Sequence, residues 1–201
     1  MTIERRATYL KYLGLSVLGV LAGAALGSVC ALAGDGPAPS TASHHHPADP
    51  PTGPAGELIR IVRESTVRFR DPAIAEAEGY HLQFGCVSGP DAGAMGLHYV
   101  NGALVGDGVL DATQPEIVIY EPLPNGRLRL IGADFLVLAD AWNAKNANPP
   151  QLYGQAFHLF ESPNRFGLPA FYTLHVWAWK ESPTGTFVNW NHNVSCDAFS
   201  G

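Results

Sequence analysis

Three ionisable side chains fall at positions where the sequence predicts the inside of a folded domain, and a histidine adds a fourth candidate for a shared site. Glu121, Asp134 and His175 each occupy an otherwise apolar row of a predicted strand, and His98 begins a short run after a Gly-containing loop. An unpaired charge is costly to bury. We therefore expect these groups to be paired, protonated or bound to a metal ion.

Two histidines combined with one or two carboxylates suit a divalent metal site. Neutral imidazole and carboxylate oxygen are good ligands for zinc, manganese and non-haem iron. We predict His98 and His175 as metal ligands, and Glu121 as a ligand or general base. Asp134 is predicted to be a ligand, a catalytic group or a residue that orients a histidine. Such an ion activates water or dioxygen or polarises a carbonyl, which indicates hydrolytic or oxidative chemistry.

Each of these residues also has a simpler interpretation, because the chain contains neither an HExxH nor a GxSxG motif. His175 would then be a hydrogen-bonded core histidine, and Glu121 a solvated residue at a strand end. Asp134 would pair with Arg127 or Arg129 near the hairpin or with another segment. The metal site is thus a hypothesis that depends on these side chains converging.

Two other functions remain open from the same residues. One is a metal-free acid–base enzyme or small-ligand-binding protein that uses the pocket together with Trp177, Trp179 and Trp190. The other is a non-catalytic module of the cell envelope whose histidines only satisfy the core. In the enzyme and ligand-binding hypotheses the expected partner is a small molecule.

The elements that position these residues read as helices followed by strands. Apolar residues recur at helical spacing over residues 58–69, and Asp71-Pro72 is typical of a second helix start. After Gly79 the pattern changes to strands, with Asn125-Gly126 as a hairpin signal. The predicted strands cover residues 80–84, 97–100, 116–121, 127–139, 155–160, 171–180 and 186–194.

No alternation of strands and helices follows, so the sheet is expected to be mostly antiparallel. The predicted fold class is α+β, with an N-terminal helix or helix pair packed on a curved β-sheet or partial barrel. Strand alternation assigns Asp134 to the same face as Leu128, Leu130, Leu136 and Leu138. It assigns His175 to the same face as Phe171, Thr173, Trp177 and Trp179.

Composition excludes several classes of protein. Of the 201 residues, 46% are apolar and only 15% are charged, which argues against a disordered chain or a coiled coil. The formal net charge of −6 argues against a nucleic-acid-binding surface, which needs clustered positive charge. We therefore expect no nucleic-acid partner.

The first 33 residues predict an export signal. Arg5, Arg6 and Lys11 precede a charge-free run over residues 12–34, and residues 31–33 supply an Ala-Leu-Ala cleavage site. The arginine pair resembles a twin-arginine signal with one extra residue, and an ordinary secretory route is the alternative. An uncleaved anchor or a lipid on Cys30 would be the only links to a membrane.

A proline-rich linker is predicted over residues 34–56, because six prolines among small polar residues cannot form a packed core. The single α+β domain then covers residues 57–201. After removal of the signal, Cys86 and Cys196 are the two remaining cysteines, so a disulfide is expected in an exported chain.

Two segments carry a resemblance to known proteins, namely MGLHYVN at residues 95–101 and LHVWAW at residues 174–179. With these segments the chain resembles a family of secreted, uncharacterised bacterial proteins. The resemblance covers nearly all of the predicted domain. It implies a single exported domain in the periplasm, at the cell envelope or outside the cell, and it indicates no activity or cofactor.

Overall fold

The N-terminal part of the domain is helical. The computed structural model describes residues 52–201, so the predicted export signal and most of the predicted linker lie outside the described residues. Helix α1 (Gly53–Thr66) is followed by the 3₁₀ turn η1 (Val67–Arg70) and by α2 (Pro72–Ala77). The carboxylate of Asp71 accepts the Ala73 N–H, as expected of an N-cap before a proline. Because α1 begins at Gly53, the folded part starts four residues before the predicted boundary at residue 57.

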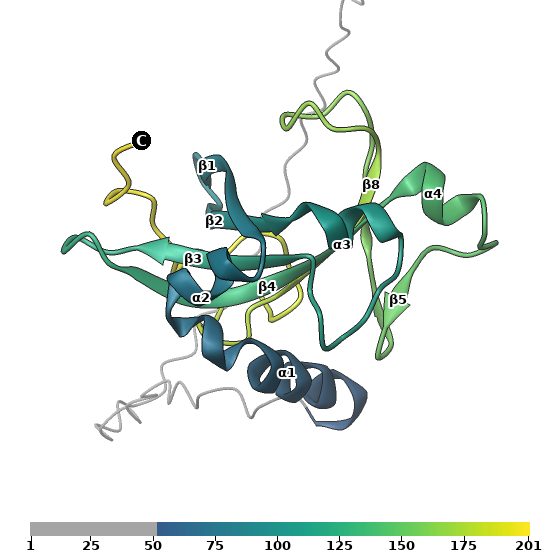
Figure 1. The fold of residues 1–201 in the computed structure, drawn as a ribbon, viewed down its shortest axis with the longest axis horizontal. Coiled ribbons are helices and arrows are strands. Elements are labelled where there is room, and N and C mark those ends of the chain that lie inside the picture. The colour runs from purple at the N-terminus through teal and green to yellow at the C-terminus, as the bar shows by residue number, and fades with distance from the viewer. Residues whose placement is uncertain (1–51) are drawn as a thin grey trace, which may run out of the picture. The chain divides into compact units, whose positions relative to one another are not determined.

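A curved antiparallel sheet follows the helices, which confirms the predicted α+β class (Figure 1). Its strand order is β1-β2-β3-β4-β8-β7, and every neighbouring pair is antiparallel. The strands are β1 (Tyr80–Gly89), β2 (Gly93–Asn101), β3 (Ile117–Pro122), β4 (Leu128–Leu138), β7 (His158–Phe160) and β8 (Phe171–Val176). Outside this sheet lie α3 (Gly102–Asp107), α4 (Ala139–Asn143) and the small pair β5 (Gln151–Leu152) and β6 (Gln155–Ala156).

Helix α1 covers one face of this sheet (Figure 1). Leu58 and Val62, one turn apart and fully buried, pack with Phe135 of β4 and Leu174 of β8. Burying side chains of this size contributes roughly 1.5–3 kcal/mol each. Since successive strand residues point to opposite faces, Asp134 and His175 must point to the face that α1 leaves uncovered.

A bulge in β4 changes the predicted facing of its first half. Ile119 pairs with Gly132, whereas Tyr120 pairs with Leu130, so Ile131 is the extra residue. Leu130 consequently packs with Tyr120, while Ile131 joins the cluster on the opposite face. The prediction that Leu128 and Leu130 share a face with Asp134 is therefore wrong, because the extra residue inverts the alternation.

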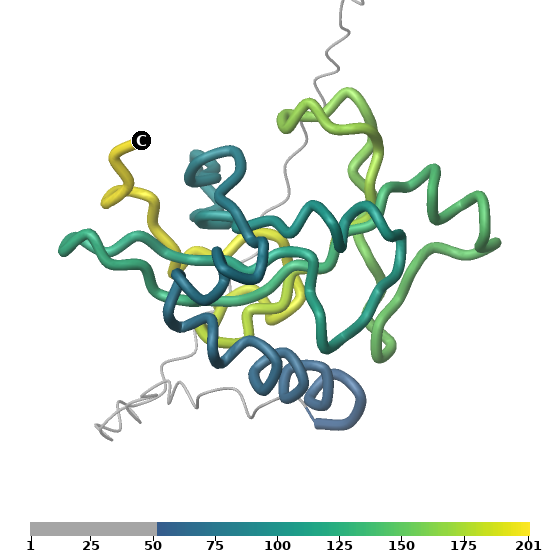
Figure 2. Tube along the Cα trace, viewed as in Figure 1, coloured from purple at the N-terminus to yellow at the C-terminus, as the bar shows by residue number. Residues whose placement is uncertain are grey.

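The last third of the chain contains fewer strand residues than predicted. Residues 186–194 form a loop with a single bridge between Asn191 and Ala94, and Figure 2 follows this yellow segment back across the sheet. The Asn191 side chain accepts the Asn193 N–H, which competes with strand pairing. The predicted strand over residues 155–160 is divided between β6 and β7, and β8 ends at Val176.

A disulfide ties the C-terminal segment to the sheet. Cys86 of β1 is bonded to Cys196, with a sequence separation of 110 residues, as predicted. Among the described residues, 52–201, there is no helix of the length and hydrophobicity needed to cross a membrane.

Replacement of both cysteines, Cys86→Ser with Cys196→Ser, should lower the free energy of unfolding. A closed loop of about 100 residues implies a contribution of about 4–5 kcal/mol through chain entropy, with about 2–5 kcal/mol typical of native disulfides. Urea unfolding of the oxidised protein, the reduced protein and the double variant measures the effect. Equal midpoints for all three would contradict it.

Candidate metal centre

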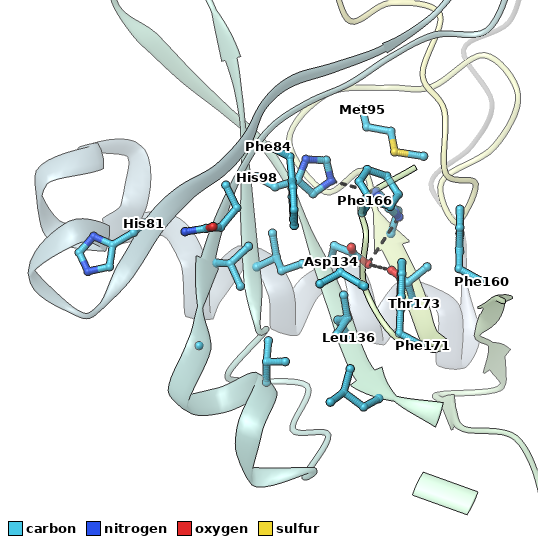
Figure 3. Close-up of a pocket in the computed structure, with 18 residues that line it drawn as sticks. His81, Phe84, Met95, His98, Asp134, Leu136, Phe160, Phe166, Phe171 and Thr173 are labelled. Carbon is cyan, nitrogen blue, oxygen red and sulfur yellow. Dashed lines mark hydrogen bonds and ion pairs between the residues drawn. The ribbon is translucent and has the colours of Figure 1, made fainter. Parts of the chain in front are cut away.

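Three of the four predicted residues meet on the face of the sheet opposite α1. His98 comes from β2, Asp134 from β4 and His175 from β8, and all three are buried. Figure 3 shows His98 and Asp134 on neighbouring parts of the sheet. Asp134 and His175 are direct partners across the β4–β8 ladder. Strands β2 and β8 are three steps apart, which is roughly 14 Å in a flat sheet. The two imidazole Nε2 atoms nevertheless lie 3.4 Å apart, so the curvature of the sheet brings them together.

Hydrogen bonding determines which nitrogen of His98 carries its proton. The Nδ1 atom lies 3.3 Å from the carbonyl oxygen of Gly96, and a carbonyl can only accept. The neutral ring is therefore protonated at Nδ1, and Nε2 directs a lone pair at His175. Metal-bound histidines typically donate their second nitrogen to a backbone carbonyl in this way.

His175 is held next to the carboxylate of Asp134. Its Nδ1 atom lies 3.5 Å from Asp134 Oδ1, while it makes no hydrogen bond of good geometry. The hydroxyl of Thr173 donates to the same Oδ1 atom and holds the carboxylate in place. In the tautomer with the proton on Nδ1, next to Asp134, Nε2 of His175 also directs a lone pair at His98, whereas in the other tautomer Nε2 donates to His98.

Burial sets the protonation states of the group. Desolvation, together with the neighbouring His175, lowers the pKa of His98 to about 4. Desolvation likewise lowers the pKa of His175 to about 3 and raises the pKa of Asp134 to about 6. At neutral pH both rings are neutral and the carboxylate is ionised, which are the forms that bind metal ions.

The distances suit one divalent ion. One ligand atom from each of His98, Asp134 and His175 can be chosen so that all three lie within 4.8 Å of one another. Two nitrogens bound tetrahedrally at about 2.0–2.1 Å from zinc would be about 3.3–3.4 Å apart. The observed 3.4 Å between the Nε2 atoms matches that spacing. The three side chains can thus hold an ion with little rearrangement.

Glu121 does not belong to this group, contrary to the prediction of a shared pocket. Its carboxylate accepts hydrogen bonds from Lys180 at 2.6 and 2.7 Å, from Arg129, and from the Ser195 N–H at 3.1 Å. Although burial alone would raise its pKa, the bonds from Lys180 and Arg129 outweigh it and lower the pKa. Ile117 pairs with Asp134, and Glu121 lies four residues further along β3, which is roughly 13 Å.

The simpler interpretations of Glu121 and Asp134 also need correction. Glu121 is only 5% exposed, so it is not a solvated strand end. Arg129 pairs with Glu121 rather than with Asp134, whose partners Thr173 and His175 belong to another segment, as the remaining alternative expected. The sequence correctly predicted that both carboxylates are buried, but it assigned them to one site. In the structure Glu121 is ion-paired, whereas Asp134 faces two imidazoles.

A cavity of about 470 Å³ opens beside the three residues. Its lining is mostly aromatic and aliphatic, with Met95, Phe160, Phe166 and Phe171 among the lining residues (Figure 3). An apolar hollow with a few convergent polar groups is the usual form of a small-molecule site.

The tryptophans expected in the pocket are not among the residues that line this cavity. Trp177 donates through Nε1 to the Val188 carbonyl, and Trp179 donates through Nε1 to Thr66 Oγ1. Trp177 and Trp179 also do not share a face, because Trp179 packs against the clusters that contain Leu58 and Phe69. The chain turns where β8 ends at Val176, and strand alternation no longer applies beyond that residue.

Gly96 and Thr173 support the site in ways that sequence reasoning missed. Gly96 has φ +89°, and a Cβ atom there would lie 2.6 Å from the Tyr120 carbonyl oxygen. Only glycine allows β2 to approach β3 this closely while its own carbonyl faces His98. In the sequence, each of these residues lies two positions before a candidate histidine, and this spacing was the only indication that it supports the site.

Three other histidines lie outside the group. His81 lines the cavity but lies apart from His98 and Asp134 in Figure 3. His158 is exposed, and its Nδ1 atom lies 3.4 Å from Asn189 Nδ2. His192 is also exposed. His81 and His192 are suitable controls for variants of the site, whereas the charge of His158 acts on His175 and Asp134.

The fold and the site together define a class: an α+β protein with a buried His/Asp/His group beside an apolar cavity. Comparisons with protein-family models, curated proteins and solved structures give no match. The resemblance to a family of secreted bacterial proteins therefore stays a prediction.

Glu116 is a further buried carboxyl group that sequence reasoning missed. It is 1% exposed, and its Oε2 atom accepts the Leu136 N–H at 3.0 Å. Burial raises its pKa to about 8, so the group is largely protonated at neutral pH. The only indication of its burial in the sequence was its position next to the apolar run of a predicted strand.

Glu116 should make the protein less stable as pH rises from about 4.5 to about 8, because only the folded state keeps its proton in that window. Its contribution approaches about 1.4 kcal/mol per pH unit for one proton. Glu116→Gln retains an oxygen that accepts the Leu136 N–H, so it should flatten this slope and raise stability at pH 8.

Urea unfolding of both proteins between pH 6.5 and 8.5 tests this expectation. The lowered pKa values of His98 and His175 and the raised pKa of Asp134 change stability below about pH 6.5. Between pH 6.5 and 8.5 the pH dependence of stability therefore reports mainly on Glu116. Parallel pH dependences for wild type and variant would refute the assignment.

Proposed function

We propose that this protein binds one divalent metal ion through His98, Asp134 and His175. The observation that carries the proposal is the convergence of two buried Nε2 atoms at 3.4 Å, next to a buried carboxylate. Two nitrogens and a carboxylate oxygen suit zinc, manganese or iron(II).

A cation explains the arrangement better than a purely structural histidine pair. The Gly96 carbonyl accepts from His98 Nδ1, and the Asp134 carboxylate lies 3.5 Å from His175 Nδ1. When both rings carry their protons on Nδ1, two unprotonated Nε2 atoms face each other inside the protein, which is unfavourable. A divalent ion between them satisfies both lone pairs and compensates the buried charge of Asp134.

We further propose that the site is catalytic, with hydrolytic or oxidative chemistry. Three protein ligands leave at least one position of a four-coordinate ion open. A bound ion would supply Lewis-acid activation of water, dioxygen or a carbonyl group. The chain itself would orient His175 through Asp134, orient Asp134 through Thr173, and exclude water with the apolar cavity wall.

Export to an oxidising compartment belongs to the same proposal. Disulfides persist in the periplasm and outside cells, and the bond between Cys86 and Cys196 suits such a location. The predicted signal over residues 1–33 supports the same route.

Metal analysis of the purified full-length chain tests the proposed site. After chelation and reloading with zinc, manganese or iron(II), we expect one ion per chain for at least one of these metals. His98→Ala and His175→Ala should each weaken binding by at least about 100-fold, because two ligands remain. Asp134→Asn should weaken it by about 10–100-fold.

His81→Ala is the matched control, because it removes an imidazole from the same cavity wall without touching the group. Competition against a chromophoric chelator measures affinity, and circular dichroism confirms the fold of each variant. Substoichiometric metal in the wild type, or equal loss in His81→Ala, would exclude the metal site. Small-molecule binding by a metal-free protein would then favour the acid–base or ligand-binding alternative.

A further inference from the structure

The cavity beside the His/Asp/His group has a lining that selects its occupant. Four phenylalanines contribute to it, together with Met95 and several aliphatic side chains. Of the described residues, those that line the cavity include four ionisable ones, Asp134 and three histidines, and no lysine or arginine. An occupant with several charged groups would therefore lose hydration without gaining partners.

We propose that this cavity binds a small molecule with an aromatic or aliphatic body and a single anionic oxygen, as in a phenol or a monocarboxylic acid. The oxygen would bind the ion held by His98, Asp134 and His175, so this inference rests on the proposed function. The body would occupy the apolar space between the phenylalanines.

Charge balance is the reason for a single anionic oxygen. A divalent cation bound to one carboxylate and two neutral imidazoles leaves one net positive charge in the site. One anionic oxygen neutralises this charge, whereas a second would be buried without a partner. An uncharged hydrocarbon would fill the cavity but leave the positive charge uncompensated.

Size supports a body larger than a single ring. An apolar cavity of about 150 Å³ is enough to bind benzene. The cavity here measures about 470 Å³ and so accommodates two fused rings or a comparable chain. Volumes between about 300 and 1,000 Å³ are usual for small-molecule sites.

Two phenylalanines from distant parts of the chain mark the mouth of the cavity. Phe84 lines the cavity although it is 50% exposed, and its ring centroid lies 5.5 Å from that of Phe166. Phe84 has φ +64° at the irregularity in β1 between Gln83 and Cys86. A bulky residue in this backbone conformation is uncommon, and such residues concentrate at ligand-binding sites. We assign Phe84 the role of a positioning residue at the entrance.

Three probes with one body separate the two parts of the proposal: naphthalene, 2-naphthol and 2-naphthoate. Binding to the full-length chain is measured by calorimetry, with and without the metal. With the metal, the two oxygen-bearing probes should bind at least about tenfold more tightly than naphthalene. Without it, this preference should fall below about threefold, while the affinity for naphthalene stays unchanged.

Variants locate the bound probe. Val105 is half-buried and lines the cavity, so Val105→Trp should weaken all three probes by at least about tenfold. Val109 lies close by in the chain but is 61% exposed and does not line the cavity. Val109→Trp is therefore the matched control, and it should leave binding unchanged. Phe84→Ala should increase the dissociation rate measured by stopped-flow fluorescence.

The inference is overturned if the metal-loaded protein binds none of the probes. It is also overturned if that protein prefers naphthalene, or if Val105→Trp and Val109→Trp have the same effect. These outcomes leave the metal site intact. A chain that takes up no metal contradicts the proposed function instead, so the two failures are distinguishable.

Discussion

The curvature of the six-stranded sheet is the constraint on which the site depends. His98 and His175 belong to strands that are three steps apart, and the bend of the sheet together with the reach of both side chains brings their Nε2 atoms to 3.4 Å. Irregular pairing in β1 and the extra residue Ile131 in β4 interrupt the regular ladders, as expected where a sheet bends. Gly96 permits the close approach of β2 to β3, and α1 packs on the opposite face. The fold thus places His98, Asp134 and His175 on the face opposite α1, among the apolar residues of a second core cluster.

Two buried carboxylates on the same strand pair show how surroundings decide a role. Glu121 accepts hydrogen bonds from Lys180, Arg129 and the Ser195 N–H, so its charge is compensated and its pKa is lowered. Asp134 faces two imidazoles and one hydroxyl, and burial raises its pKa to about 6. Glu121 therefore connects the sheet to the C-terminal segment, which the Cys196 disulfide also holds. Asp134 is not ion-paired with any lysine or arginine that the structure describes, so its carboxylate can bind a ligand.

The His/Asp/His group and the cavity complement each other physically. Low polarity around the group strengthens electrostatic interactions with a bound ion and keeps the imidazoles neutral. The group in turn gives an otherwise apolar cavity one point at which a polar atom is stabilised. Hydrogen bonds from His98 to Gly96 and from Thr173 to Asp134 fix the directions of these side chains before any ligand arrives. Such preorganisation reduces the entropy lost on binding.

The sequence by itself determined the local pattern: helices before strands, an antiparallel α+β sheet, a cysteine pair, and the burial of Glu121, Asp134 and His175. These follow from periodicity and residue type, which depend on near neighbours in the chain. Only the tertiary structure separated Glu121 from the site, because its partners Lys180 and Ser195 are 59 and 74 residues away. Alternation also failed beyond the bulge at Ile131, where one extra residue inverts the facing of side chains. The cavity arises from segments distant in sequence, so spacing along the chain could not reveal it.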